Sequence, residues 1–311
     1  MEEKLIIRLS NNIGNQMFMF AAGYATSKLL KRKFYFDNLS SYKSRKNIYT
    51  YALDGFEIPD DITSSGDNFT NISGYLRRKI TKKIDPFFKK KSFILEKYQQ
   101  NKETEFNVIN TNQSYKDTLY MEGYFESEKY FSKYKKDLLN IFTPKKKLKF
   151  QKNKYFDDIV NNESVSLCLR QNRFTEKFSS ITNLDRNKSK VFLDEQVSFV
   201  FSAIEYFKKK LNSPSFYLWS NNFENLKDVF KNYNVKFVDN SNILDEVEKM
   251  HLDLFLMTKC KHYAVIPSAF NWWGTWLAKN NDKIVVRPRS NFFRFLNVKN
   301  KDYWPDDWIS L

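Results

Sequence analysis

Apolar and polar positions alternate along the chain in blocks typical of an α/β protein. Residues 5–9 form a short apolar block, and the apolar positions from Met17 to Leu29 recur at helical spacing. Residues 33–37, KFYFD, predict a second strand, which completes a β-α-β unit with parallel strands. The pattern over residues 40–120 is less regular and predicts no strand order.

A linker divides the chain into two halves of similar size. The segment Phe142–Lys154 interrupts the periodicity with Pro144 and a run of lysines, so we expect domains of residues 1–150 and 151–311. The alternation begins again after the linker, with expected strands at 164–169, 215–220, 235–238, 263–267 and 283–287 and expected helices at 194–211, 225–233, 245–260 and 270–279. Two such halves predict an α/β fold with two Rossmann-like, doubly wound domains facing a cleft.

The charge of the chain points to an anionic partner. The 311 residues include 52 Lys and Arg against 36 Asp and Glu, a formal net charge of +16. Nucleic acid, a nucleotide ligand and an acidic membrane surface all fit this charge. We do not expect nucleic-acid binding, because the basic runs at 77–91 and 145–154 belong to no helix-turn-helix, zinc finger or aromatic RNA-binding motif.

Cysteine content and hydropathy restrict the compartment. Cys168 and Cys260 lie far apart, which argues against a disulfide framework or a zinc site. The short apolar run before Arg8 predicts no signal peptide, and residues 264–278 are fewer than the roughly 20 that a spanning helix needs. We therefore expect a cytoplasmic protein, and the charge favours peripheral contact with the anionic inner face of the plasma membrane, where a lipid-linked oligosaccharide acceptor would reside.

Polar residues follow three of the expected strands, at the edge where open α/β sheets bind their ligands. In the first stretch, Gly14, Asn15 and Gln16 are expected to form a turn after the strand. Gly14 would allow close approach of a ligand, and the two amides would face a sugar or phosphate. The alternative is a purely structural turn that caps the following helix.

The second and third stretches offer anion-binding groups. The apolar strand in SLCLRQNRF ends on Arg170, followed by Arg173, and a guanidinium can hold a phosphate through two parallel hydrogen bonds. An aromatic helix is expected to begin at Ser268, Ala269 and Phe270. The Ser268 hydroxyl and the backbone N–H groups of the first turn would form an anion site. The structural alternatives are ordinary surface cations and a serine cap above core tryptophans.

These stretches together resemble the bacterial α-1,2-fucosyltransferases of glycosyltransferase family 11. The resemblance rests on the Gly-Asn-Gln opening with QMFMFAAGYA, on GYFESEKYF, on the strand that ends in Arg170 and on PSAFNWWGTWLA, and it extends to YWPDDWI near the C-terminus. It implies a GT-B fold, GDP-β-L-fucose as donor substrate, inversion at the anomeric carbon, and neither metal nor other cofactor. The chain also has no Asp-x-Asp pattern, the carboxylate pair expected for a cation that bridges a diphosphate.

Several positions depart from the pattern of the family. Where the family shows His-x-Arg-Arg-Gly-Asp, this chain matches only at Arg170, to which the resemblance gives the phosphate-binding role, with Cys168 at the histidine position and Arg173 at the carboxylate position. Asn221 and Asn222 replace the aspartates of a Ser-Asp-Asp stretch, so any contact with guanine lacks a charge.

The sequence therefore predicts an inverting galactoside α-1,2-fucosyltransferase of O-antigen or surface polysaccharide synthesis. The expected catalytic residues are Arg170, Asn15 and Glu176, with Glu126 and Asp185 as further candidates for a base. The expected donor-binding residues are Gly14, Asn15, Gln16, Arg170, Arg173, Asn221, Asn222, Ser268, Ala269 and Phe270. The alternatives are a transferase for another nucleotide sugar and a non-catalytic carbohydrate-binding protein.

Overall fold

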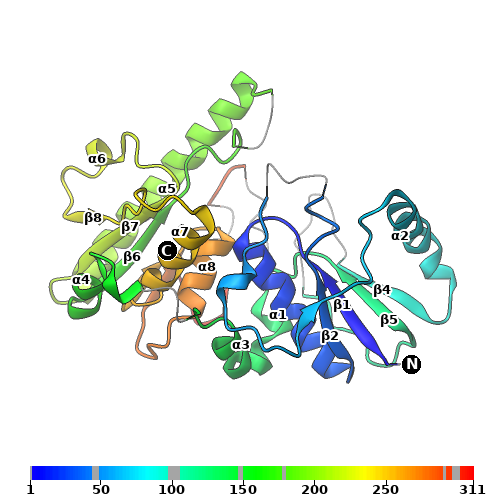
Figure 1. The fold of residues 1–311 in the computed structure, drawn as a ribbon. Helices are drawn as coiled ribbons and strands as arrows, with labels where there is room; N and C mark the ends of the chain where they lie inside the picture. Colours follow the sequence, from blue (N-terminus) through cyan, green and yellow to red (C-terminus); the bar gives the residue numbers. More distant parts are fainter. Residues whose placement is uncertain are drawn as a thin grey trace. The chain divides into compact units, whose positions relative to one another are not determined.

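The computed structural model describes residues 2–43, 49–96, 106–145, 150–176, 180–289, 292–295 and 302–311 (Figure 1). The chain divides into two compact units, of which unit 1 comprises residues 1–145 and 300–305 and unit 2 comprises residues 146–299 and 306–311. The sequence predicted one boundary after residue 150. In the structure the chain also returns to unit 1 near its end, where the Asp302 carboxylate accepts the Phe106 N–H at 2.7 Å and pairs with Lys129.

Unit 1 is built on a parallel five-stranded sheet in the order β3-β2-β1-β5-β4. Its strands are β1 (Lys4–Arg8), β2 (Lys33–Asp37), β3 (Thr63–Ser64), β4 (Lys91–Leu95) and β5 (Tyr115–Glu122). Its helices are α1 (Ile13–Leu29), α2 (Ile72–Ile84) and α3 (Lys135–Ile141), with 3₁₀ turns at 53–55, 85–87, 128–130 and 132–134. Strands β2 and β3 follow on one side of β1, and β4 and β5 lie on its other side. The strand order therefore reverses between β1 and β5.

Helix α1 forms because its residues can be buried almost all round. Met17 and Phe20 are fully buried, and the hydroxyl of Tyr24 donates to the Asp137 carboxylate of α3 at 3.0 Å. At Gly23 an added Cβ would lie 2.8 Å from the Ile7 Cβ, so glycine permits the close approach of α1 to β1.

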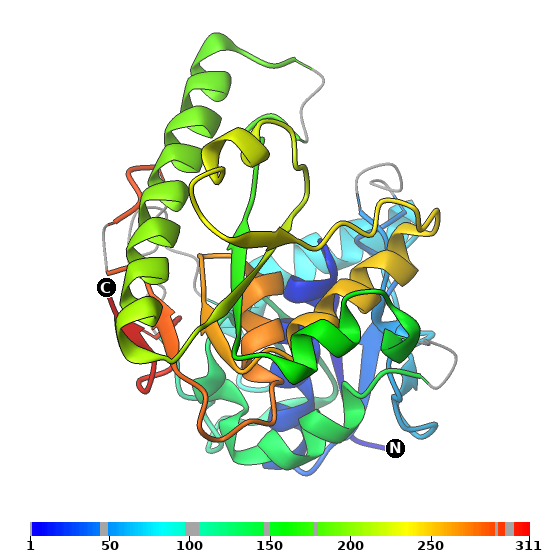
Figure 2. The same ribbon diagram turned by 90° about the vertical axis from the view of Figure 1, so that its left-hand side faces the viewer.

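Unit 2 is built on a parallel six-stranded sheet in the order β11-β10-β9-β6-β7-β8. Its strands are β6 (Ser164–Leu169), β7 (Ser215–Ser220), β8 (Val235–Phe237), β9 (His262–Ala264), β10 (Val285–Arg287) and β11 (Ile309–Ser310). Its helices are α4 (Phe156–Asn161), α5 (Asn183–Lys210), α6 (Leu226–Val229), α7 (Glu246–Met257) and α8 (Ala269–Trp276), with a 3₁₀ turn at 150–152. Figure 2 shows the long helix α5 running along this unit. The strand order reverses between β6 and β9.

The structure confirms the expected α/β class and corrects several bounds. The strands at 33–37, 164–169 and 215–220 have the predicted limits. Helix α5 begins at Asn183, earlier than the predicted Asp194, because Thr182 and Asp185 close a capping box ahead of a polar first turn that masks the helical period. The helix expected over 225–233 is reduced to α6. In the described part of the chain, no helix has both the length and the apolarity to cross a bilayer.

Candidate active site

The carboxyl edge of the unit 2 sheet carries most of the predicted site residues. The neighbouring parallel strands β6 and β9 pair Ser166 with Tyr263. Arg170 follows β6, and the start of α8 follows β9, so both lie at the carboxyl edge of the sheet where the strand order reverses. This is the place where open α/β sheets bind ligands.

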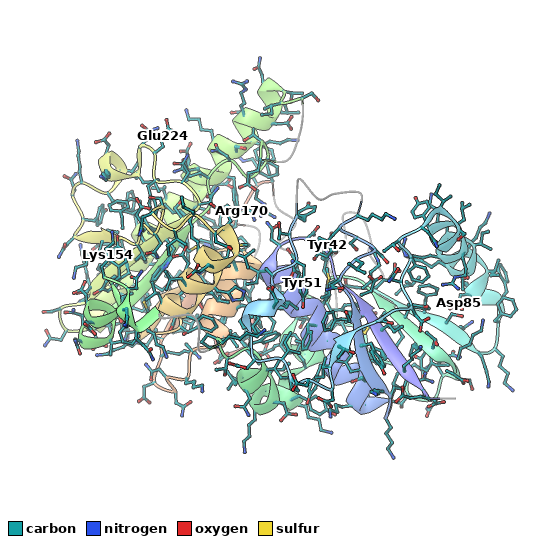
Figure 3. The ribbon with its side chains drawn as sticks, in the orientation of Figure 1. Tyr42, Tyr51, Asp85, Lys154, Arg170 and Glu224 are labelled. Carbon is teal, nitrogen blue, oxygen red and sulfur yellow. The ribbon has the colours of Figure 1, made fainter. Side chains whose placement is uncertain are left out.

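A buried amide from α5 holds the backbone of Arg170. The Gln196 side chain accepts the Arg170 N–H at 2.8 Å and donates to the Arg170 carbonyl at 3.0 Å. Gln196 is fully buried and also donates to the Phe192 carbonyl at 3.1 Å. The sequence analysis missed Gln196, and a polar residue on the apolar face of a predicted helix is the signal that identifies it. Its bonds fix the direction in which the Arg170 side chain leaves the strand (Figure 3).

The Arg170 guanidinium faces Glu176. Its Nη2 lies 2.7 Å from Glu176 Oε2, and its Nε donates to Oε1 at 3.3 Å. The Arg170 and Glu176 side chains are 26% and 21% exposed, so the pair is partly accessible to a ligand. An incoming phosphate would compete with Glu176 for the same two donors, because carboxylate and phosphate bind the guanidinium fork in the same way.

Arg173 packs against an aromatic ring of α5. Its guanidinium carbon is 5.8 Å from the centroid of the Phe192 ring, a cation–π distance. The structure therefore places Arg173 against α5, whereas Arg170 projects beside Glu176.

The two asparagines after β7 support the loop that follows β6. Asn221 accepts the Gln171 N–H at 2.8 Å and donates to the Gln171 carbonyl at 3.1 Å. The Asn222 side chain accepts the Glu224 N–H at 2.8 Å. Both side chains were predicted to contact guanine. In this structure the Asn221 side chain fixes the backbone next to Arg170, and the Asn222 side chain fixes the backbone of its own loop. Contact of either side chain with guanine stays a prediction.

The first turn of α8 lies at the same edge of the sheet as Arg170. The first intrahelical bond runs from Trp272 N to Ser268 O at 2.9 Å, which leaves the N–H groups of residues 269–271 without intrahelical partners. The Ser268 hydroxyl makes no capping bond to the helix, and Ser268, Ala269 and Phe270 are partly exposed. The next residue, Asn271, is fully buried and accepts the Ile266 N–H at 2.8 Å, which fixes the strand end to the helix.

Cys168 stands at the histidine position of the family pattern, but its thiol is not available as a polar contact. Its side chain is buried in β6, and burial raises the pKa of its thiol to about 12. The thiol therefore stays protonated and packs as an apolar group.

The Gly-Asn-Gln stretch was predicted to be a turn, and this is wrong. Helix α1 already begins at Ile13, so Gly14, Asn15 and Gln16 form its first turn, and the strand-to-helix connection is made before it by Asn11, in the left-handed region at φ 61°. The sequence analysis placed the helix too late because these three residues are polar or small.

Gln16 is a structural residue in this conformation. It is fully buried, donates to the carbonyls of Asn11 and Thr50 at 2.7 and 2.8 Å, and accepts the Ala52 N–H at 2.9 Å. These bonds connect α1 to the segment at 50–52. Gly14 is also buried within the helix.

Asn15 meets a carboxylate at the point where the unit 1 strand order reverses. Its Nδ2 donates to Glu126 Oε1 at 2.6 Å, and both residues are partly exposed. Nearby, the Asn11 amide donates to the Tyr124 hydroxyl at 3.1 Å. Asn11 and Asn15 follow β1, whereas Tyr124 and Glu126 follow β5, so each unit carries a polar group at its own reversal of strand order.

The third base candidate has a local role. Asp185 bonds the hydroxyl and the N–H of Thr182 at 2.6 and 3.1 Å, and these bonds lower the pKa of Asp185. Asp185 is thus the third helical residue of α5 and closes the capping box with the N-cap Thr182. Among the described residues, no group of three or more His, Cys, Asp or Glu side chains has a geometry that could hold a metal ion.

Two comparisons of the sequence identify relatives of the chain. The model of glycosyl transferase family 11 matches residues 73–311. An α-1,2-colitosyltransferase of Escherichia coli is 26% identical over 312 residues, which cover 99% of this chain and 98% of that protein. The O-antigen biosynthesis glycosyltransferase WbnK of Escherichia coli is 27% identical over 317 residues, with 97% and 99% covered.

Solved structures share the fold at low identity. The NodZ α-1,6-fucosyltransferase of Bradyrhizobium, soaked with GDP-fucose, aligns with a TM-score of 0.51 at 13% identity over 89% of this chain and 93% of that chain. A variant of FUT1 of Arabidopsis thaliana in complex with GDP aligns with a TM-score of 0.55 at 11% identity, over 94% of this chain and 72% of that chain.

The two parallel-sheet units and these likenesses show the GT-B fold. The match over residues 73–311 then shows that the chain belongs to glycosyl transferase family 11. The resemblance seen in the sequence is thereby confirmed.

Proposed function

We propose that this glycosyltransferase moves L-fucose from GDP-β-L-fucose to the 2-hydroxyl of a terminal galactoside, with inversion and without a metal ion. The proposal is supported by family membership and by the α-1,2 linkage in the name of one E. coli relative. Synthesis of O-antigen or another surface polysaccharide is the proposed context, because WbnK carries that role in its name. The acceptor is proposed to be an oligosaccharide, carried on a lipid.

The observation that carries the proposal is that Arg170 and the start of α8 follow neighbouring strands at the strand-order reversal of unit 2. A guanidinium fork can bind a phosphate bidentately, and the first turn of a helix offers N–H groups to an anion. Both features favour a diphosphate, and both stabilise the negative charge that develops on GDP when the bond to the sugar breaks. We therefore propose Arg170, Ser268, Ala269 and Phe270 as donor-binding residues and unit 2 as the nucleotide-sugar domain.

Two other residues of unit 2 act through the backbone at Arg170. Gln196 and Asn221 hold the backbone on either side of the Arg170–Gln171 bond. Catalysis by inversion depends on alignment of the acceptor hydroxyl with the breaking bond, so such positioning matters for the rate.

The choice of base follows from the partners of the two glutamates. Glu176 is paired with the Arg170 cation and also accepts a hydrogen bond from the Asn221 amide at 3.3 Å, whereas the Glu126 carboxylate accepts a hydrogen bond from the Asn15 amide at the strand-order reversal of unit 1. We therefore propose Glu126, oriented by Asn15, as the base that takes the acceptor proton, with unit 1 as the acceptor domain and Glu176 as the ion that Arg170 exchanges for phosphate.

A second donor is the principal alternative. One relative is an α-1,2-colitosyltransferase, and the aspartates expected to read guanine are Asn221 and Asn222 here. A colitosyl donor in place of fucose fits the same phosphate site. Peripheral contact with the anionic inner face of the plasma membrane is also part of the proposal.

Titration calorimetry in the presence of EDTA tests the nucleotide specificity. We expect GDP to bind and ADP and UDP to bind at least tenfold more weakly, because the family resemblance implies a guanine nucleotide. Selective binding of ADP or UDP, or loss of GDP binding on addition of EDTA, would contradict the proposal. Absence of binding by all three nucleotides would favour the non-catalytic carbohydrate-binding alternative.

A further inference from the structure

Helix α2 and the turn after it form an unusual surface of unit 1. Residues 72–91 contain eight Lys or Arg against one acidic residue, Asp85, a net charge of +7 within a chain whose total is +16. The same segment exposes large apolar side chains, with Ile72 81% and Ile80 59% exposed. Figure 1 shows α2 at the periphery of its unit, beyond the edge strand β4.

The apolar face of α2 points away from the protein. Ile72, Leu76, Ile80 and Ile84 recur every four residues and so share one side of the helix, and each is at least 40% exposed. A helix on the surface of a globular protein normally buries such a stripe. In α2 the one buried residue is Gly74, and its N–H is capped by the Asn71 side chain at 2.7 Å.

Ion pairs attach the opposite face of α2 to the rest of unit 1. Arg78 and Lys82 stand two residues from Leu76 and Ile80, roughly 200° around the helix, and both bind the buried carboxylate of Glu122. Burial alone would raise the pKa of Glu122, but the hydrogen bonds from Arg78 and Lys82 and the charge of Arg8 outweigh it and hold this pKa at about 2. The anchor therefore stays ionised at physiological pH, and it directs the apolar stripe outward.

The turn after α2 is braced so that it presents aromatic side chains. The buried Asp85 carboxylate accepts the N–H groups of Ser92 and Phe93 at 2.7 and 3.2 Å (Asp85 is labelled in Figure 3). Lys91 Nζ donates to the carbonyls of Asp85, Pro86 and Phe88 at 2.7–3.1 Å. These bonds fix a tip on which Phe87 is 88% exposed and Phe88 is 49% exposed.

We infer that α2 and this tip dock the protein on an anionic lipid bilayer. The exposed stripe and Phe87 would enter the boundary between headgroups and acyl chains, and basic side chains would contact lipid phosphates; the exposed ones are Arg77, Lys79, Lys83, Lys89 and Lys90. The helix has 13 residues, enough to lie on a bilayer and too few to cross it. This combination of apolar stripe and high positive charge fits a lipid surface better than a protein partner, and it does not depend on the identity of the transferred sugar.

Vesicle flotation of the full-length protein tests the inference. We expect binding to vesicles that contain phosphatidylglycerol and weak binding to pure phosphatidylcholine. Lys79→Gln/Lys83→Gln is expected to weaken binding tenfold or more, because each basic residue at the surface contributes about fivefold. Leu76→Ser/Ile80→Ser is expected to weaken it at least as much. The matched controls are Lys209→Gln/Lys210→Gln on exposed lysines of α5 and Leu244→Ser on an isolated leucine that is 95% exposed, and both should bind like the wild type.

Hydrogen exchange on the unmodified protein gives a readout that does not rely on folding of the variants. Anionic vesicles should slow amide exchange in residues 72–90 and leave α5 unchanged. Equal binding to both kinds of vesicle, unchanged binding by the α2 variants, or no binding at all would overturn the inference. So would a wild-type dimer in solution that Leu76→Ser/Ile80→Ser converts to a monomer, since the stripe would then be a contact between two copies.

Discussion

Replacing Arg170 by alanine is expected to lower kcat/KM for the nucleotide-sugar donor by about 10²–10³-fold, because removal of one preorganised group that stabilises developing charge costs about 3–4 kcal/mol. The measurement is initial-rate kinetics with the donor varied, together with GDP titration, in which affinity should fall as well. The fold should persist, since the side chain of Arg170 is partly exposed and its contacts are with Glu176.

Arg186→Ala is the matched control for this prediction. Arg186 is an exposed arginine of the first turn of α5 in the same unit, so its loss should change kcat/KM less than twofold. If the melting temperature of Arg170→Ala falls in proportion to its activity, the role of Arg170 is structural. Full activity of the variant would remove the phosphate-binding role altogether.

Replacing Glu126 by glutamine is expected to reduce kcat by about 10²–10⁴-fold, the range of general base catalysis. The variant keeps the size of the side chain and an oxygen that can accept the hydrogen bond of Asn15 at 2.6 Å. The KM for the donor should therefore change little.

Glu176→Gln distinguishes the two carboxylates. Because this substitution releases Arg170 from its ion pair, we expect donor affinity to rise severalfold while kcat stays within a few fold of the wild type. Glu128→Gln, two residues beyond Glu126, controls for a general effect of charge in that segment. The account is wrong about the base if Glu176→Gln loses kcat by two orders of magnitude and Glu126→Gln does not.

The sequence pattern predicted the fold where burial dictates it. β6 is buried along its whole length, so its apolar run Ser164–Leu169 has clear limits, and β2 is bounded by polar residues on both sides. The pattern failed where stabilisation is polar or local. The sequence analysis missed α2 although Ile72, Leu76, Ile80 and Ile84 recur every four residues. In the structure this stripe stays exposed, and the helix is instead held by the ionic contacts of Arg78 and Lys82 with Glu122.

The candidate site was predictable in part for a related reason. The end of an apolar strand can be predicted from the sequence, and parallel strands bring their carboxyl ends to one edge of the sheet. Arg170 and Ser268 could therefore be predicted as site residues. Side-chain hydrogen bonds between residues far apart in the sequence cannot be predicted in this way. The bonds of Arg170 with Gln196 and of Asn15 with Glu126 join residues 26 and 111 positions apart, and only tertiary structure creates them.

A transfer assay tests the central claim most directly. The purified protein is incubated with GDP-fucose and a terminal β-galactoside in the presence of EDTA, and the product linkage is determined by NMR. We expect a fucosyl-α-1,2-galactoside and release of one GDP for each product. Transfer of colitose but not fucose from its nucleotide donor, a linkage to another hydroxyl, or GDP binding with no transfer to any galactoside would contradict the account.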